Sequence, residues 1–143
     1  NLDPRAGCAN STGVGATLRA GASGTNSVTA DDLVLELAQL PPHQSALIYM
    51  GAERDFALFG DGQRLARPGP PGFQYYRFPV RNAGVEGVVR EGPGLVAWSR
   101  AHFQEGVIVA GSTWHFQGYY RDPQGPCGLR FNLSDALSVQ FAP

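Results

Sequence analysis

The closing stretch of the chain, GSTWHFQGYYRDPQGPCGLRFNLSDALSVQF (residues 111–141), decides the fold. It contains two runs in which apolar residues recur at every second position, joined by a long turn rich in Gly and Pro. Such alternation places every second side chain on one face of a β-strand. It therefore predicts two strands of a β-sandwich core. The residues expected on their inner faces are Trp114, Phe116, Gly118, Tyr120, Leu137, Val139 and Phe141.

The rest of the chain repeats this pattern between frequent turn signals. Residues 33–37 carry Leu at every second position, and Pro41 ends the run because proline cannot donate a hydrogen bond to a β-ladder. Residues 60–62, Gly-Asp-Gly, fit a tight hairpin turn. Residues 95–103 also fit one or two helical turns. We predict an all-β, antiparallel sandwich of the immunoglobulin or jelly-roll type, with about eight or nine strands and one short helical turn near 95–103.

Length and composition bound the classes of function. A chain of 143 residues fits one domain, here residues 1–143, with residues 1–10 as an extended N-terminal arm. Its net charge of −1 and 16% charged residues leave no basic stripe for nucleic acid. No apolar run approaches the length of a membrane span. From the charge and the lack of a long apolar run, we expect a protein that neither binds nucleic acid nor inserts into a membrane. Because the chain begins without Met, we also expect it to be a mature or excised piece.

The two cysteines, Cys8 and Cys127, lie near opposite ends of the sequence and match no C-x-x-C redox or zinc motif. Each stands in a Gly-rich polar segment rather than in an apolar strand, which favours a disulfide between them. A pair of buried free thiols is the alternative. The disulfide would place the protein in an oxidising, extracellular compartment.

Oxygen-bearing side chains are concentrated at the expected strand ends, where β-sandwich modules bind calcium. They match no EF-hand loop, and ordinary turn and capping roles are the alternative. No other cofactor is indicated. The candidate ligands of a structural calcium ion are Asp31, Asp32, Asp122, Asn132 and Asp135.

Three aromatic residues, Tyr119, Trp98 and Tyr75, are candidates for a glycan-binding platform, because flat rings stack on sugar faces. The competing interpretation is that they belong to the core. Catalytic motifs are absent from the sequence: the histidines form no metal-ligand pair, and His115 is expected simply to point outward from its strand. We therefore expect no catalytic residues and no enzymatic activity.

Seven segments carry a resemblance: GSTWHFQ (111–117), YRDP (120–123), FNLSDALSV (131–139), CANSTG (8–13), DDLVL (31–35), LPP (40–42) and FGDG (59–62). Together they resemble a β-sandwich module found near the C-termini of large secreted proteins of GC-rich Gram-negative bacteria. The resemblance implies a secreted all-β unit with no established catalytic role. Relatives carry a Cys after the FGDG motif, whereas residues 63–67 have none, which leaves Cys8 and Cys127 to pair with each other.

The leading functional hypothesis is a non-enzymatic extracellular structural module, such as an adhesion, surface-layer or self-assembling fibre subunit. Its partners would be copies of itself or other cell-surface proteins, since exposed sheet edges pair readily. A glycan-binding accessory module is the alternative. An enzyme with a site assembled only by the fold is the second alternative.

Overall fold

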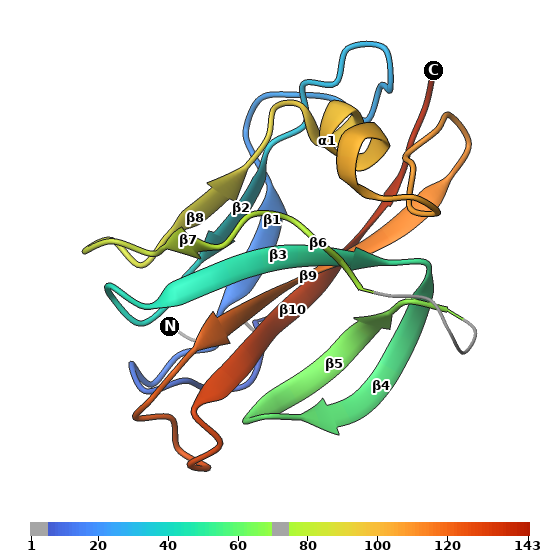
Figure 1. The fold of residues 1–143 in the computed structure, drawn as a ribbon. Helices are drawn as coiled ribbons and strands as arrows, with labels where there is room; N and C mark the ends of the chain where they lie inside the picture. Colours follow the sequence, from blue (N-terminus) through green and yellow to red (C-terminus); the bar gives the residue numbers. More distant parts are fainter. Residues whose placement is uncertain (1–5, 70–74) are drawn as a thin grey trace.

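The structure is a computed structural model that describes residues 6–69 and 75–143. Within these residues it is all-β with one short helix (Figure 1), as the sequence predicts, and it has ten strands rather than eight or nine. The elements are β1 (Thr17–Ala20), β2 (Leu35–Ala38), β3 (Ser45–Gly51), β4 (Glu53–Phe59), β5 (Gly62–Arg67), β6 (Tyr76–Arg77), β7 (Arg81–Asn82), β8 (Val89–Glu91), α1 (Leu95–His102), β9 (Thr113–Arg121) and β10 (Phe131–Gln140).

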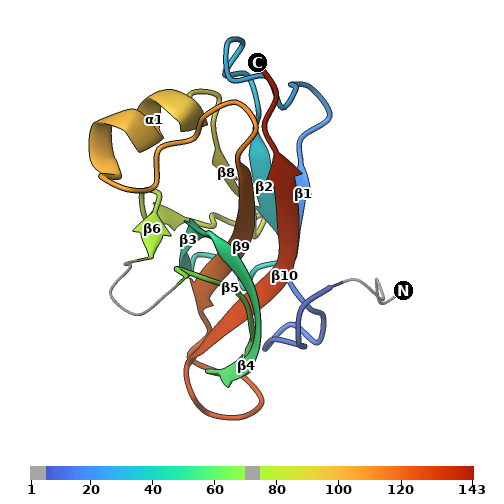
Figure 2. The same cartoon turned by 90° about the vertical axis from the view of Figure 1, so that its right-hand side faces the viewer.

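Two antiparallel sheets form the sandwich. The smaller has the order β1-β2-β8, and the larger has the order β10-β9-β3-β6, with β7 also paired to β3. A separate hairpin, β4–β5, lies over the outer face of the larger sheet, with β5 next to β9 and β10 (Figure 2). Helix α1 closes one end of the space between the sheets, where it buries Leu95 and Val96.

The main core fills the space between the two sheets. The inner-face residues predicted for β9 lie in it, with Phe116 and Tyr120 fully buried. Gly118 lies directly against Leu37 of β2 across the core, because a Cβ at this position would lie 2.3 Å from Cδ1 of Leu37. A side chain at position 118 would therefore force Leu37 to move. Burial of this continuous apolar core is the main source of the stability of the fold.

A β-bulge in β10 changes which of its residues face the main core. Leu133 pairs with Tyr119 and Ala136 with Gln117, so β10 contains one residue more than β9 over this interval. The extra residue reverses the alternation. Leu133 therefore belongs to a small outer cluster, whereas Leu137 packs on the main core.

The outer face of β9 is buried as well, which corrects the expectation that His115 points outward. His115 is only 8% exposed, and Gln117 is fully buried. The reason is the β4–β5 hairpin, which covers this face where sequence alternation alone predicts solvent. β9 is thus a central strand with both faces covered.

Residues 1–5 of the expected N-terminal arm lie outside the described residues. The part of the arm that follows them packs on the domain. Gly7 donates a backbone hydrogen bond to Ala16, and the buried side chain of Asn10 donates to the carbonyl oxygen of Gln39.

Candidate binding site

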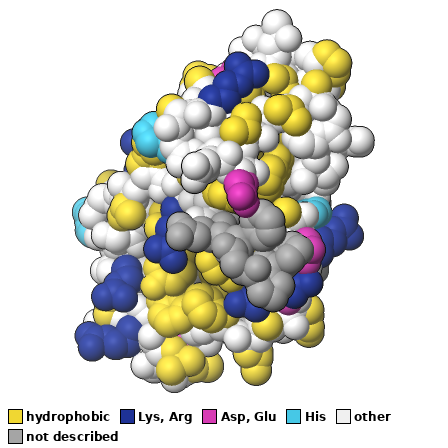
Figure 3. Space-filling model, turned by 45° about the vertical axis from the view of Figure 1, so that its right-hand side comes forward, with side chains coloured by type: hydrophobic (Ala, Val, Ile, Leu, Met, Phe, Trp, Pro, Cys, Tyr) yellow, Lys and Arg dark blue, Asp and Glu magenta, His cyan; other side chains and the backbone are white. Residues whose placement is uncertain are grey.

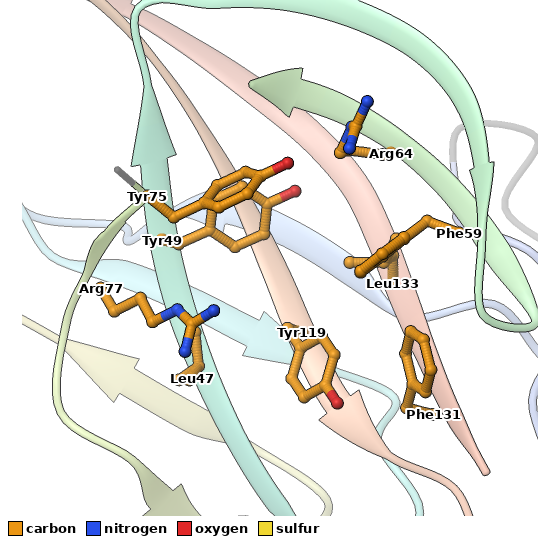
Figure 4. Close-up of a pocket in the computed structure, with 9 residues that line it drawn as sticks. All are labelled: Leu47, Tyr49, Phe59, Arg64, Tyr75, Arg77, Tyr119, Phe131 and Leu133. Atoms are coloured by element: carbon orange, nitrogen blue, oxygen red, sulfur yellow. The ribbon is translucent and has the colours of Figure 1, made fainter. Parts of the chain in front are cut away.

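A pocket of about 330 Å³ opens on the outer face of the larger sheet, beside the β4–β5 hairpin (Figure 4). This volume lies at the lower end of the range of ligand-binding pockets. Figure 3 shows hydrophobic side chains gathered on the lower part of the molecule, next to basic ones. The pocket is lined by Leu47, Tyr49, Phe59, Arg64, Tyr75, Arg77, Tyr119, Phe131 and Leu133.

Aromatic rings form the walls of the pocket. On one side Tyr75 meets Tyr49 edge-on, with ring centroids 5.2 Å apart. On the other side the rings of Tyr119 and Phe131 stack at 5.1 Å, and Phe59 packs edge-on against Phe131 at 5.2 Å. Because each ring is held by another ring, the walls are preformed rather than assembled by a ligand.

The buried amide of Gln117 fixes the base of this site. Its Oε1 accepts hydrogen bonds from the hydroxyl of Tyr49 (2.6 Å) and from the backbone N–H groups of Leu65 and Ala66. Its Nε2 donates to the carbonyl oxygens of Gln63 and Ser134, each at 2.8 Å. One side chain of β9 thereby joins β5, β10 and β3.

Tyr49 is a neutral structural wall at neutral pH. Burial raises the pKa of its phenol well above the ordinary range, so the hydroxyl keeps its proton and donates a hydrogen bond to Oε1 of Gln117. Gln117 was not among the candidate residues predicted from the sequence. The one available signal for Gln117 was an amide at an outer-face position of an otherwise apolar strand.

Two arginines give the pocket a positive rim. Arg64 lies over the ring of Phe59, with its guanidinium carbon 5.9 Å from the ring centroid, and pairs with Asp55. Its guanidinium holds the pKa of the Asp55 carboxyl below the usual range, mainly through this hydrogen bond. Arg77 is exposed and has no ion-pair or hydrogen-bond partner among the residues that the structure describes. Within the described residues, its five N–H donors are therefore available to a ligand.

The structure brings together two of the three residues predicted for glycan binding. Tyr75 and Tyr119 line the same pocket, although they are 44 positions apart in the sequence. Trp98 lies on α1, where its ring stacks on His102 at 3.7 Å and packs partly on the main core. Phe59 and Phe131 belong to the pocket but were not predicted, because only the fold places the hairpin turn beside the start of β10.

The five oxygen donors predicted for calcium do not form one cluster. Both carboxylate oxygens of Asp31 accept from the first turn of α1, at Val96 N and Ala97 N. Asp32 accepts from Thr25 N and its hydroxyl, and these bonds lower the pKa of the Asp32 carboxyl.

The other three predicted donors lie away from α1. Asp135 accepts from Leu18 N and pairs with Arg19 on β1. Asp122 and Asn132 lie at the neighbouring ends of β9 and β10, where the amide of Asn132 donates to the carbonyl oxygens of Cys8 and Ala9. Across residues 6–69 and 75–143, no three His, Cys, Asp or Glu side chains are placed to hold a metal ion.

The predicted disulfide is wrong in this structure, where Cys8 and Cys127 are exposed free thiols. Cys8 precedes the buried Asn10, and Cys127 lies in the exposed loop after β9. Placement in polar, Gly-rich segments thus reflects surface loops rather than a covalent bond. The alternative of buried free thiols is also incorrect, because both cysteines are exposed.

No protein-family model and no curated protein matches the chain. A crystal structure described as a tetra-tandem repeat in the extending region of a large adhesion protein is similar over 88% of this chain and 24% of that chain, with a TM-score of 0.46 and 12% sequence identity. None of the helical segments in the described residues is both long and apolar enough to cross a membrane.

Proposed function

We propose that the chain is a non-enzymatic extracellular binding module whose aromatic pocket takes up carbohydrate, with a preference for sugars that carry a carboxylate. The observation that carries the proposal is a preformed pocket in which flat rings stand beside an arginine without a partner in the described chain. The extracellular setting is the one implied by the resemblance of residues 111–141 to modules of secreted proteins.

The walls suit the apolar face of a sugar ring. Tyr119 and Phe131 stack on each other at an interplanar angle of 30°, which holds both rings in the wall of the pocket. A pyranose offers C–H groups on its faces and hydroxyl groups around its edge, and it therefore needs aromatic rings together with hydrogen-bond donors. The pocket supplies both, since Arg64 and Arg77 stand among the rings.

The arginines favour an acidic sugar. A guanidinium binds a carboxylate through two parallel N–H···O bonds, which are stronger than hydrogen bonds between neutral groups. Arg64 already pairs with Asp55, so the rim residue Arg77 would make this contact. Uronic or sialic acids are thus the expected ligand class.

Screening on a glycan array, followed by calorimetry with a sugar that binds, tests the proposal. Replacing Tyr119 by Ala should weaken binding about tenfold through lost stacking. Phe56→Ala, which removes an exposed ring outside the pocket, should leave the affinity unchanged. Equal loss in both variants, or an array without binding, would contradict the proposed site.

The preference for a carboxylate has its own test. Arg77→Gln should reduce affinity for an acidic sugar more than for its neutral analogue. Arg100→Gln, a matched change on the exposed face of α1, should affect neither. If Arg77→Gln weakens both sugars equally, the pocket selects for ring shape and not for charge.

The free edge of the β4–β5 hairpin favours a second function, self-association with another copy of this chain. Within the described residues, β4 pairs only with β5 and leaves its other backbone edge open. The same strand exposes Phe56 (78%) and Leu58 (85%). An open edge that carries apolar side chains is a template for strand pairing, so antiparallel β4–β4 contact would bury both.

Sedimentation velocity over a concentration series tests this second function. The unmodified chain should form dimers as its concentration rises, and Leu58→Lys should remain monomeric. Val85→Lys, which charges an exposed apolar residue in a distant turn, should still dimerise. Monomers of the unmodified chain at every concentration would rule out pairing through β4.

A further inference from the structure

Two carboxylates from different turns are buried at the same end of the sandwich. Asp61 lies in the turn between β4 and β5, and Asp122 directly follows β9. Asp61 is 8% exposed and Asp122 is fully buried. Carboxylates are rarely buried to this extent unless a positive charge or several hydrogen bonds compensate them.

Each carboxylate is only half satisfied. Asp61 accepts a hydrogen bond from Leu129 N at 3.0 Å through Oδ1, and Asp122 accepts one from Ser11 N at 2.9 Å through Oδ2. The other oxygens, Oδ2 of Asp61 and Oδ1 of Asp122, are buried without a partner in the described parts of the chain. Neither residue has an ion pair with a described cation. Such orphaned oxygens call for an unseen partner.

The two carboxylates converge on one point beside Gly125. A Cβ added to this glycine would lie 2.3 Å from Oδ2 of Asp61 and 2.9 Å from Oδ2 of Asp122. A Cβ at this position would collide with both carboxylates, so glycine is what allows Asp61 and Asp122 to lie this close to each other. The Asp61 oxygen at this point is the orphaned one, and the Asp122 oxygen is the one that accepts from Ser11 N. We call this close pair of buried carboxylates beside Gly125 the cradle.

We propose that this cradle binds a calcium ion through Asp61 and Asp122. Calcium takes oxygen ligands, including carboxylates, backbone carbonyls and water, in flexible geometry, which suits ligands from two loops. Bound there, the ion compensates two buried negative charges and links the β4–β5 turn to the loop after β9. Of the five calcium ligands predicted from the sequence, only Asp122 belongs to this site. Its partner, Asp61, lies in the FGDG turn.

Calorimetry with calcium chloride on the intact chain, together with melting curves in calcium and in EDTA, tests the proposal. The unmodified chain should bind one ion, and its melting temperature should rise by about 5 °C or more at calcium a hundredfold above Kd. Asp61→Asn and Asp122→Asn should each weaken binding at least about tenfold, as expected for loss of a charged ligand. Asp32→Asn, an acidic residue near α1, should bind like the unmodified chain.

A second readout separates a lost ligand from a lost fold. In EDTA, Asp61→Asn should melt no lower than the unmodified chain, because it removes one of two adjacent buried charges. Gly125→Ala should lose calcium binding although both carboxylates remain. An unmodified chain that shows neither binding heat nor a calcium-dependent melting shift, or an equal shift in both Asn variants, would overturn the proposal.

Discussion

His115 shows how the covered outer face of β9 alters a single side chain. Its Nδ1 lies 2.6 Å from the hydroxyl oxygen of Ser138 on β10, and the ring is almost fully buried. Burial lowers the pKa of His115, and the charge of Arg54 lowers it further. The folded protein thus favours the neutral imidazole, whereas the unfolded chain takes up a proton near pH 6.5.

The resulting pH dependence is testable. Because the unfolded state binds the proton more readily, stability is fully present above about pH 6.5 and falls as the pH drops from there towards the lower, folded-state pKa. Urea denaturation at several pH values should show this fall in the unmodified chain and a smaller one in His115→Gln. His43→Gln should keep the unmodified slope. If His115→Gln loses as much stability as the unmodified chain when the pH falls, the burial of His115 does not cause the pH dependence.

At the scale of the element, the β4–β5 hairpin depends on one buried amide. Gln117 makes five hydrogen bonds, three of them to backbone groups of β5 at Gln63, Leu65 and Ala66. A two-stranded hairpin is barely stable in isolation, so these bonds and its contacts with β9 and β10 keep it in place.

Removing the amide should loosen the hairpin. Gln117→Leu leaves buried polar partners unsatisfied and should destabilise the domain by about 2–4 kcal/mol, measured by urea denaturation. Gln140→Leu, at an exposed position of β10, should change stability by less than about 0.5 kcal/mol. Hydrogen exchange should be faster in β5 of the Gln117 variant. A loss below about 1 kcal/mol would show that other contacts hold the hairpin.

At the scale of the whole molecule, no disulfide joins Cys8 to Cys127, and both residues are free thiols. Because Cys8 and Cys127 are exposed and unpaired, both should react with a thiol reagent in the folded protein, and reductant should not change the melting temperature. Cys8→Ser and Cys127→Ser should each retain one reactive thiol. Two unreactive cysteines together with a lower melting temperature in reductant would show that the disulfide does form.

The sequence predicts the sandwich well because alternation is a local property. In β9 the inner-face residues Phe116 and Tyr120 are recognised from period two alone. The burial of Gln117 cannot be recognised from this alternation, because it depends on a hairpin that begins more than fifty residues earlier. The bulge in β10 is equally hidden, since only the pairing of Leu133 and Ala136 with β9 reveals the extra residue.

The sites follow the same rule. Tyr75 and Tyr119 could be proposed as ligand-binding aromatics from their type, but the fold alone reveals that they share a pocket with Phe131. Likewise, the FGDG motif predicts a tight turn at Asp61. That this turn folds its carboxylate towards Asp122 is a tertiary contact with no local signal.

We propose that the pocket between the larger sheet and the β4–β5 hairpin binds an acidic sugar. Titration of isotope-labelled protein with such a sugar, followed by amide NMR, tests it most directly. Shift changes should be confined to residues around the pocket, in β3, β5, β6, β9 and the start of β10, and they should disappear in Tyr119→Ala. Shift changes centred on α1 and Trp98, or none at saturating sugar, would contradict it.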